Sequence, residues 1–385
     1  MILIQNATIY TMEDTVIEKG DVLVDEGKIK EIGENITVPE GATLINGEGK
    51  MLFPGMIDAH SHLGLFEHAI GFEGADVNEM TDPSTPHLRA IDGINPMDKT
   101  FTDAVEGGIT STATGPGSAN VIGGQFAVIK TYGDFIDEMI IDPCNAMKIA
   151  FGENPKRVYA EKKKSPMTRM ATAAVLRENL FKAKAYMEKK EEAGLDQSKM
   201  PAYDMKMEAL LPVLERKIPL KAHAHRADDI LTAIRIAKEF NVKMTLEHCT
   251  EGHLIADVIK KEGLSAVVGP SFGHSTKFEL KNKTFDTPRV LNEAGVKVAI
   301  MTDHPVIPIE SLPMAAALAV KSGMKEMEAL KAITIYPAEI IGMDHRMGSI
   351  KVGKDADLVL WDKSPLDLQS KVDVTIIDGK IAFQR

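Results

Sequence analysis

The chain has 385 residues, of which 44% are hydrophobic and 26% charged, with 45 Lys and Arg against 56 Asp and Glu. This is globular composition in a chain too long for one small core, and the net charge of -11 disfavours nucleic acid or an anionic membrane surface as the main partner. No stretch approaches the roughly 18 consecutive apolar residues that a membrane-spanning helix needs. We therefore expect an acidic enzyme with a small-molecule substrate, no nucleic-acid partner and no membrane partner.

The two cysteines, Cys144 and Cys249, are too few for a disulfide framework. The opening segment MILIQNATIYTMED has neither the basic start nor the long apolar stretch of a signal peptide. Together these observations predict a cytoplasmic protein.

Residues 1–53 contain short apolar or alternating runs separated by Gly, Glu and Asn turns, namely MILIQNATIY, DVLVDEGKIKEIG and TLINGEG. Their period of two, with no helical pattern, predicts β strands. Residues 342–385 return to the same texture in GSIKVGKDADLVLWD and VDVTIIDGKIAFQR. Because short hairpins are marginal alone, we expect strands from both chain ends to pair into one small β-sandwich.

Between residues 54 and 341, eight strand candidates alternate with amphipathic helical segments. The strand candidates are LFPGMIDAH, GITSTATG, GQFAVIKT, AMKIAFGE, PLKAHAH, VKMTLEH, LSAVVGP and VKVAIMTD. A long helix is expected around SLPMAAALAVKSGMKEMEALKAIT, near the end of this region. The alternation predicts an α/β fold, a (β/α)8 TIM barrel beside the β-sandwich. Association into a homo-oligomer is left open, because no stretch fixes a subunit count.

Imidazole and carboxylate side chains stand where four of these strands end: His60, His62, His223, His225, His248 and Asp303. In a barrel of this class, catalytic groups lie at the carboxyl ends of the strands. Strand alternation puts His60 and His62 on one face, so both rings can reach one ion. Imidazole and carboxylate together are a typical ligand set for zinc or a similar divalent ion.

These residues resemble the metal-dependent amidohydrolase superfamily, in particular the branch of imidazolonepropionase and related dipeptidases and cyclic-amide hydrolases. The matching motifs are PGMIDAHSHLG, KAHAH, LEHCTEG, MTDHP and YPAEIIGMDHRMGSIKVGKDADLVLWD, which together extend over essentially the whole chain. The resemblance implies a metal-dependent hydrolase of an amide, peptide or cyclic-amide bond. The motifs do not specify the substrate.

Carried onto this sequence, the resemblance implies one or two Zn²⁺ ions, although other divalent metals also fit. His60, His62 and Asp303 would bind one ion, and His223 and His248 would bind a second or orient substrate. His223 closes its strand within Lys-x-His and is favoured as the ligand over His225, which would then point toward substrate from the start of the loop.

The fourth strand departs from the best-known binuclear pattern, in which a carboxylated lysine bridges two metals. AMKIAFGE ends in Glu153, whereas we expect Lys148 near the beginning of the strand, at the wrong end of the barrel. Some relatives use a glutamate, so Glu153 is the candidate bridge. If Glu153 only caps the loop, the site holds one ion.

The expected chemistry is attack by water on a carbonyl, with Asp303 as general base and then general acid. His225 and His274 are the candidate donors to the oxyanion. Substrate-binding residues are expected at His225 and Arg226, and at Gly124 and Gln125 in the glycine-rich stretch TATGPGSANVIGGQ.

Two alternatives stay open at this point. A deaminase would use the same barrel and Asp303, but relatives of that kind usually carry a glutamate three residues after the fifth-strand histidine, where this chain has Arg226. A non-catalytic barrel scaffold is the other alternative, and the presence of every expected ligand residue counts against it.

Overall fold

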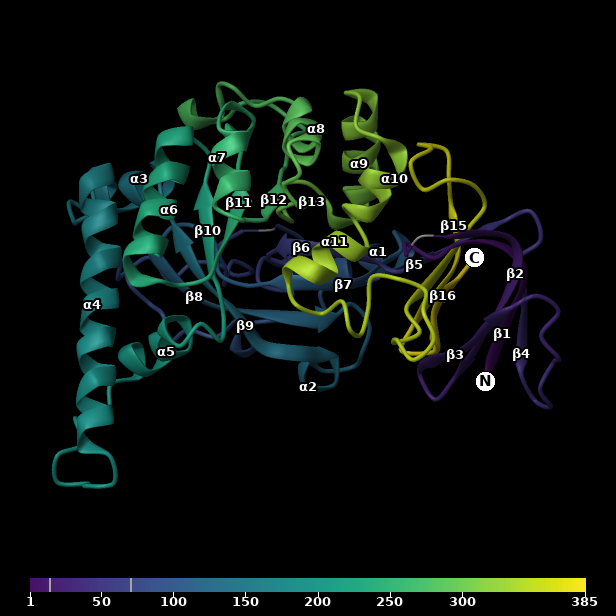
Figure 1. Ribbon diagram of the computed structural model, residues 1–385, viewed down its shortest axis with the longest axis horizontal. Helices are drawn as coiled ribbons and strands as arrows, with labels where there is room; N and C mark the ends of the chain where they lie inside the picture. Colours follow the sequence, from purple (N-terminus) through teal and green to yellow (C-terminus); the bar gives the residue numbers. More distant parts are fainter. Residues whose placement is uncertain (14, 70) are drawn as a thin grey trace.

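The computed structural model describes residues 1–13, 15–69 and 71–385. Its strands form two eight-stranded sheets, one in the middle of the molecule and one at the end where both chain termini lie (Figure 1). A long helix, α4 (Arg169–Ala193), stands at the opposite end. The central sheet is the barrel that positions the candidate site.

All eight strand candidates between residues 54 and 341 are strands of the central sheet, so the predicted number of strands is confirmed. They are β6 (Met56–Ser61), β7 (Ile109–Thr114), β8 (Ile122–Lys130), β9 (Ile140–Ala150), β10 (Leu220–Ala224), β11 (Met244–His248), β12 (Ala266–Val268) and β13 (Val298–Ile300). They neighbour one another in chain order, which gives a nearly closed barrel within a mixed α/β fold.

The third strand of the barrel departs from the regular pattern. Strand β8 pairs antiparallel with both β7 and β9, whereas the other barrel pairs are parallel. Only residues 115–121 separate β7 from β8, fewer than the dozen or so that a parallel crossover needs. The prediction of eight regular β/α units is therefore wrong at this position, although the strand itself is present.

The outer strands of the sheet, β6 and β13, are joined through a buried carboxylate. Asp58 on β6 accepts hydrogen bonds at Oδ2 from the backbone N of Thr302 at 3.0 Å and from its Oγ1 at 2.5 Å. Its Oδ1 accepts from the backbone N of His60 at 3.0 Å. The backbone carbonyl of Ala332 accepts a hydrogen bond from Ile300 N on β13, and that of Ile333 accepts one from Ile57 N on β6, both at 2.9 Å. These bonds fix the end of β13 against the end of β6.

The helices pack mainly outside the barrel sheet. Besides α4 they are α1 (Lys99–Glu106), α2 (Ile136–Met139), α3 (Glu153–Glu161), α5 (Met205–Leu214), α6 (Ala227–Phe240), α7 (Ala256–Lys261), α8 (Asp286–Glu293), α9 (Leu312–Lys321), α10 (Glu326–Lys331) and α11 (Ile335–Ile340). Short 3₁₀ turns are η1 (Glu67–Ala69), η2 (Ala90–Asp92), η3 (Gly252–Leu254), η4 (Phe278–Leu280) and η5 (Ile309–Ser311). Among the residues that the structure describes, no helix is long and apolar enough to span a membrane.

The long helix expected near residues 311–334 is two helices, α9 and α10, so this prediction is wrong. Gly323 lies between them with a φ of 96°, a backbone conformation that residues with a side chain rarely adopt. A left-handed glycine at this point ends α9 and redirects the chain.

Strands from both chain ends share the second sheet. It contains β1 (Ile2–Tyr10), β2 (Val16–Asp25), β3 (Lys28–Gly33), β4 (Thr43–Asn46), β5 (Met51–Pro54), β14 (Leu358–Trp361), β15 (Val372–Ile377) and β16 (Lys380–Gln384). The two ends meet where β14 pairs antiparallel with β5. The expected pairing of the two ends is present, whereas a two-layer sandwich and the domain bounds 1–53, 54–341 and 342–385 stay predictions.

A buried cluster of charges ties the barrel to this terminal sheet. Lys130, at the end of β8, places its Nζ 2.5 Å from Oδ2 of Asp357, 3.0 Å from Oδ1 of Asp378 and 3.2 Å from Oδ2 of Asp355. Asp355 also pairs with Arg346 at 2.9 Å. The side chains of Lys130 and Asp357 are only 2% and 4% exposed, so water has little access to replace Lys130 as the partner of Asp357, whereas Asp378 is 44% exposed.

We predict that Lys130→Met lowers the free energy of unfolding by about 3–5 kcal/mol, because it leaves the buried carboxylate of Asp357 without its counter-ion. Urea unfolding followed by circular dichroism measures the change. Lys30→Met is the matched control, since Lys30 is exposed on β3 and should change stability by less than about 0.5 kcal/mol. Equal losses in the two variants would contradict the role given to Lys130.

Candidate active site

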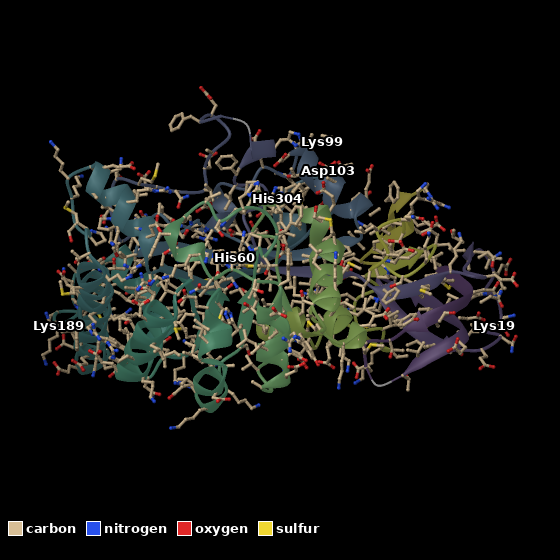
Figure 2. The ribbon with its side chains drawn as sticks, turned by 90° about the horizontal axis from the view of Figure 1, so that it is seen from above. Lys19, His60, Lys99, Asp103, Lys189 and His304 are labelled. Carbon is tan, nitrogen blue, oxygen red and sulfur yellow. The ribbon has the colours of Figure 1, made fainter. Side chains whose placement is uncertain are left out.

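Two groups of candidate ligands lie at the carboxyl ends of the barrel strands. The first consists of His60, His62 and Asp303, and the second of His223, His225 and His248; within each group the ligand atoms lie within 4.8 Å of one another. The two groups lie next to each other: the ring centroids of His60, in the first group, and His248, in the second, are 5.4 Å apart. Figure 2 places His60 near the middle of the molecule, between Lys189 at the α4 end and Lys19 at the terminal-sheet end. The structure thus brings together the six strand-end residues singled out in the sequence.

In the first group, hydrogen bonds set the orientation of both imidazole rings. Nδ1 of His60 lies 2.6 Å from Oε2 of Glu247, and Nδ1 of His62 lies 2.6 Å from the carbonyl oxygen of Gly115. Since these oxygens accept, each ring carries its proton on Nδ1 and presents the lone pair of Nε2. The two Nε2 atoms are 3.5 and 3.3 Å from the same Oδ1 atom of Asp303. Two imidazole lone pairs and a carboxylate oxygen therefore converge.

The second group contains buried ring nitrogens without partners. Nδ1 of His248 lies 2.8 Å from the carbonyl oxygen of Gly269, and Nδ1 of His225 lies 2.7 Å from Oγ1 of Thr250. Within the described residues, neither ring nitrogen of His223 has a hydrogen-bond partner, and Nε2 of His225 also has none. Buried polar atoms are rarely left unpaired. The donor set of both groups therefore fits a divalent cation.

Electrostatics favour the neutral, metal-binding form of these rings. Burial, followed by smaller contributions from neighbouring cationic groups, holds four pKa values well below the ordinary value for histidine. The affected residues are His60, His223, His225 and His248. A neutral imidazole can donate a lone pair to a metal at physiological pH, whereas a protonated ring cannot.

Lys148 lies within the site, so the expectation that it stands at the wrong end of the barrel is wrong. Its Nζ is 2.9 Å from Nε2 of His60, and its side chain is buried. The error came from taking the run AMKIAFGE as the strand, because β9 begins at Ile140 and Lys148 is only two residues from its end. Burial lowers the pKa of Lys148 to about 7, while the carboxylates of Asp303 and Glu247 act in the opposite direction.

Glu153, the expected metal bridge, lies outside both groups at the start of α3. Its backbone N donates to Oε2 of Glu279 at 2.8 Å, and its own Oε2 accepts from the backbone N of Glu279 at 3.3 Å. These reciprocal bonds correspond to loop capping by Glu153, the alternative to a metal bridge that the sequence left open.

The remaining predicted substrate residues are not joined to either group by a contact in the described parts of the chain. His274 is exposed in the loop after β12. Arg226 forms an ion pair with Asp228 at 2.8 Å and precedes α6. The substrate roles of His274 and Arg226 stay predictions.

Gly124 and Gln125 lie on β8, the antiparallel strand. Gly124 stands opposite Lys148 in the ladder with β9. The backbone N of Gln125 donates to the carbonyl of Leu88 at 2.8 Å, which ties the strand to the long loop between β6 and α1. Their role in lining the substrate site therefore stays a prediction. Gly124 is paired across the ladder with Lys148, which lies in the site.

Sequence reasoning missed Glu247, whose Oε2 accepts from His60 and lies 3.0 Å from Nζ of Lys221. Regular alternation would send Glu247 and His248 to opposite faces of β11. His248 instead has a φ of 66°, and this left-handed turn brings both side chains inward. Such a conformation costs about 1–3 kcal/mol and is typical of functional sites. The sequence does indicate that Lys221, the partner of Glu247, points into the site. Lys221 stands two residues before His223 on β10, so strand alternation puts both side chains on the same face.

The chain is similar to known proteins over most of its length. The profile of the amidohydrolase family matches residues 51–382. Amidohydrolase tasK of Hapsidospora irregularis is 30% identical over 94% of this chain, which spans only 40% of that relative's length. An imidazolonepropionase of Streptococcus pyogenes serotype M6 is 24% identical over 92% of this chain and 86% of its own. A solved amidohydrolase from Thermotoga maritima MSB8 is 48% identical, with a TM-score of 0.97 and complete coverage of both chains.

We predict that Glu247→Gln weakens zinc binding by about 10- to 100-fold, because the neutral amide no longer orients His60 as a charged acceptor. Competition with a chromophoric chelator measures the affinity, with circular dichroism as the check on folding. Glu262→Gln is the control, since Glu262 pairs with Lys238 at 2.8 Å on the surface. Unchanged affinity in Glu247→Gln would remove it from the metal site.

Proposed function

Because the chain belongs to the amidohydrolase family and is a hydrolytic enzyme acting on carbon–nitrogen bonds, we propose that it hydrolyses an amide, peptide or cyclic-amide bond. Asp303 is the proton shuttle in this proposal. The observation that carries it is the convergence of Asp303 Oδ1 on Nε2 of His60 and His62, at 3.5 and 3.3 Å.

His60, His62 and Asp303 would hold one divalent cation, zinc or another metal, and His223 and His248 would hold a second. When bound, such an ion lowers the pKa of water from about 15.7 to about 7 and polarises a carbonyl group. The fit rests on the lone pairs of Nε2 that both groups present and on the unpartnered nitrogens of His223.

Proton transfer falls to Asp303. Its backbone φ of 53° turns the carboxylate from the end of β13 toward the histidines of β6. In this position the carboxylate can take a proton from the attacking water and deliver it to the leaving nitrogen, as general base and then general acid.

His225 supports the intermediate as a hydrogen-bond donor. The hydroxyl of Thr250, 2.7 Å from Nδ1, can donate to that atom, which leaves the neutral ring with its proton on Nε2. Nε2 has no partner among the described residues and is free to donate to an oxyanion. The exposed His274 has no comparable geometry.

Deamination is less well supported. Arg226 occupies the position where deaminating relatives place a glutamate, and it is paired with Asp228. A scaffold without activity would not require two groups of converging, buried metal-ligand side chains.

Lys148 replaces Glu153 as the candidate bridge between two ions. Its neutral amine can attack the carbon of CO₂: the N–C bond forms as one C–O π bond opens to an oxyanion, the nitrogen then gives one proton to water, and the product is an anionic carbamate. The two carbamate oxygens would carry the negative charge that offsets repulsion between two divalent cations. The support is the burial of Lys148 and the 2.9 Å between its Nζ and Nε2 of His60.

The first test is Asp303→Asn in zinc-loaded protein, assayed against a panel of dipeptides and N-acyl amino acids. Loss of the proton shuttle should lower kcat by about 10²- to 10⁴-fold with the fold intact by circular dichroism. Asp344→Asn, at an exposed position, should retain turnover. Near-normal turnover in Asp303→Asn would remove this residue from the mechanism, and full turnover after chelation would remove the metal.

The second test compares Lys148→Met with Glu153→Gln by metal analysis. Lys148→Met should reduce the metal content from about two ions toward one, because the bridging charge is lost. Wild-type protein in ¹³C-bicarbonate should show a carbamate signal by NMR that Lys148→Met lacks. Loss of metal in Glu153→Gln alone, with no carbamate signal in wild type, would restore Glu153 as the bridge.

A further inference from the structure

Lys277, in the loop between β12 and η4, carries a positive charge with little compensation. Its side chain is only 20% exposed. Within residues 1–13, 15–69 and 71–385, its ammonium makes no hydrogen bond, and its one carboxylate contact is with Oε1 of Glu279 at 3.8 Å. That distance exceeds the 2.7–2.9 Å or so of a charge-assisted hydrogen bond. Three N–H donors are therefore available at a mostly buried position.

The contacts of Glu279 place this ammonium beside the second histidine group. Oε1 of Glu279 lies 3.7 Å from Nε2 of His225 and has no hydrogen-bond partner among the described residues. The other carboxylate oxygen is held by the backbone N of Glu153 at 2.8 Å. Lys277 and His225 thus both lie near the same buried carboxylate oxygen, which places Lys277 at the border of the second histidine group.

Charge effects agree with this placement. Burial is the main cause of the low pKa of His225, and the charge of Lys277 is the next. Burial also lowers the pKa of Lys277 itself, while the carboxylates of Glu279 and Asp303 act in the opposite direction. These directions agree with the contacts of Glu279, which relate Lys277 to the second histidine group.

A second lysine, Lys283, forms hydrogen bonds with the backbone of the loop that carries Lys277. Nζ of Lys283 donates to the backbone carbonyls of Gly273 at 2.7 Å and His274 at 3.1 Å. Oγ of Ser275 donates to the carbonyl of Leu280 at 2.9 Å. These bonds hold the backbone on both sides of Lys277.

We propose that Lys277 binds a carboxylate of the substrate, which narrows the substrate class to amides with a carboxylate near the scissile bond, such as N-acyl amino acids or peptides with a free carboxyl terminus. The oxyanion is already assigned to His225, whose Nε2 has no partner among the described residues, which leaves the Lys277 ammonium for another anionic group of the substrate. This inference rests on the proposed amide hydrolysis.

The test compares N-acetyl-L-amino acids and dipeptides with their carboxy-terminal amides, using zinc-loaded wild type, Lys277→Met and Lys277→Arg. Lys277→Met should raise KM for the acids by about 10- to 100-fold, with kcat within a few fold, because one charge-assisted hydrogen bond is lost. KM for the neutral amides should not change, and Lys277→Arg should restore part of the affinity. Lys281→Met is the matched control, since Lys281 is exposed and stacks over Phe278 at 4.8 Å.

Equal effects of Lys277→Met on acids and amides would overturn the inference and leave amide hydrolysis standing, as would a wild-type preference for the amides. If wild type hydrolyses neither series, the proposed function fails, and calorimetry decides the inference alone. Binding of N-acetyl-L-alanine, but not of N-acetyl-L-alaninamide, that disappears in Lys277→Met would support it. Equal binding of both compounds, or binding of neither, would overturn it.

Discussion

The carboxylate of Asp58 is the join on which the candidate site depends. His60 and His62 belong to the first barrel strand and Asp303 follows the last, so their convergence requires these strand ends to stay together. Asp58 accepts from the backbone of His60 on one side and from Thr302 on the other. Burial raises the pKa of Asp58 to about 6, while the hydrogen bonds from Thr302 and His60 lower it. Three donors to this buried carboxylate join the two strand ends, together with the backbone bond from His62 N to the carbonyl of His304 at 2.8 Å.

Several buried charged side chains of the barrel are paired with protein groups of opposite charge. They differ in this respect from the buried groups that remain available to a ligand. Glu247 is shared between His60 and Lys221, and Lys130 is surrounded by carboxylates from the terminal sheet. Unpartnered nitrogens on His223 and the nearly unpaired ammonium of Lys277 are different, because protein atoms do not satisfy them. His223 lies near the carboxyl end of β10 and Lys277 in the loop after β12, on the side of the barrel where barrel enzymes bind substrate.

Family membership sets the class of chemistry, whereas loops set the substrate. The histidine groups and Asp303 come from strand ends that the barrel holds rigidly. Lys277 comes from a loop that Lys283 fixes, and the reciprocal bonds between Glu153 and Glu279 anchor its far end. If Lys277 binds substrate as proposed, specificity can change in this loop without disturbing the strands that carry the candidate metal ligands.

The sequence by itself determined the eight barrel strands and the six strand-end residues, because alternation and strand termination are local properties of the chain. Tertiary structure alone decided the antiparallel direction of β8, the inward turn at His248 and the position of Lys148 in the site. It also decided that His225 and Lys277 both lie near the carboxylate of Glu279. These features depend on where a strand begins, on a single left-handed residue and on contacts between distant loops. None of them leaves a periodic signal in the sequence, since each is fixed by packing across the fold.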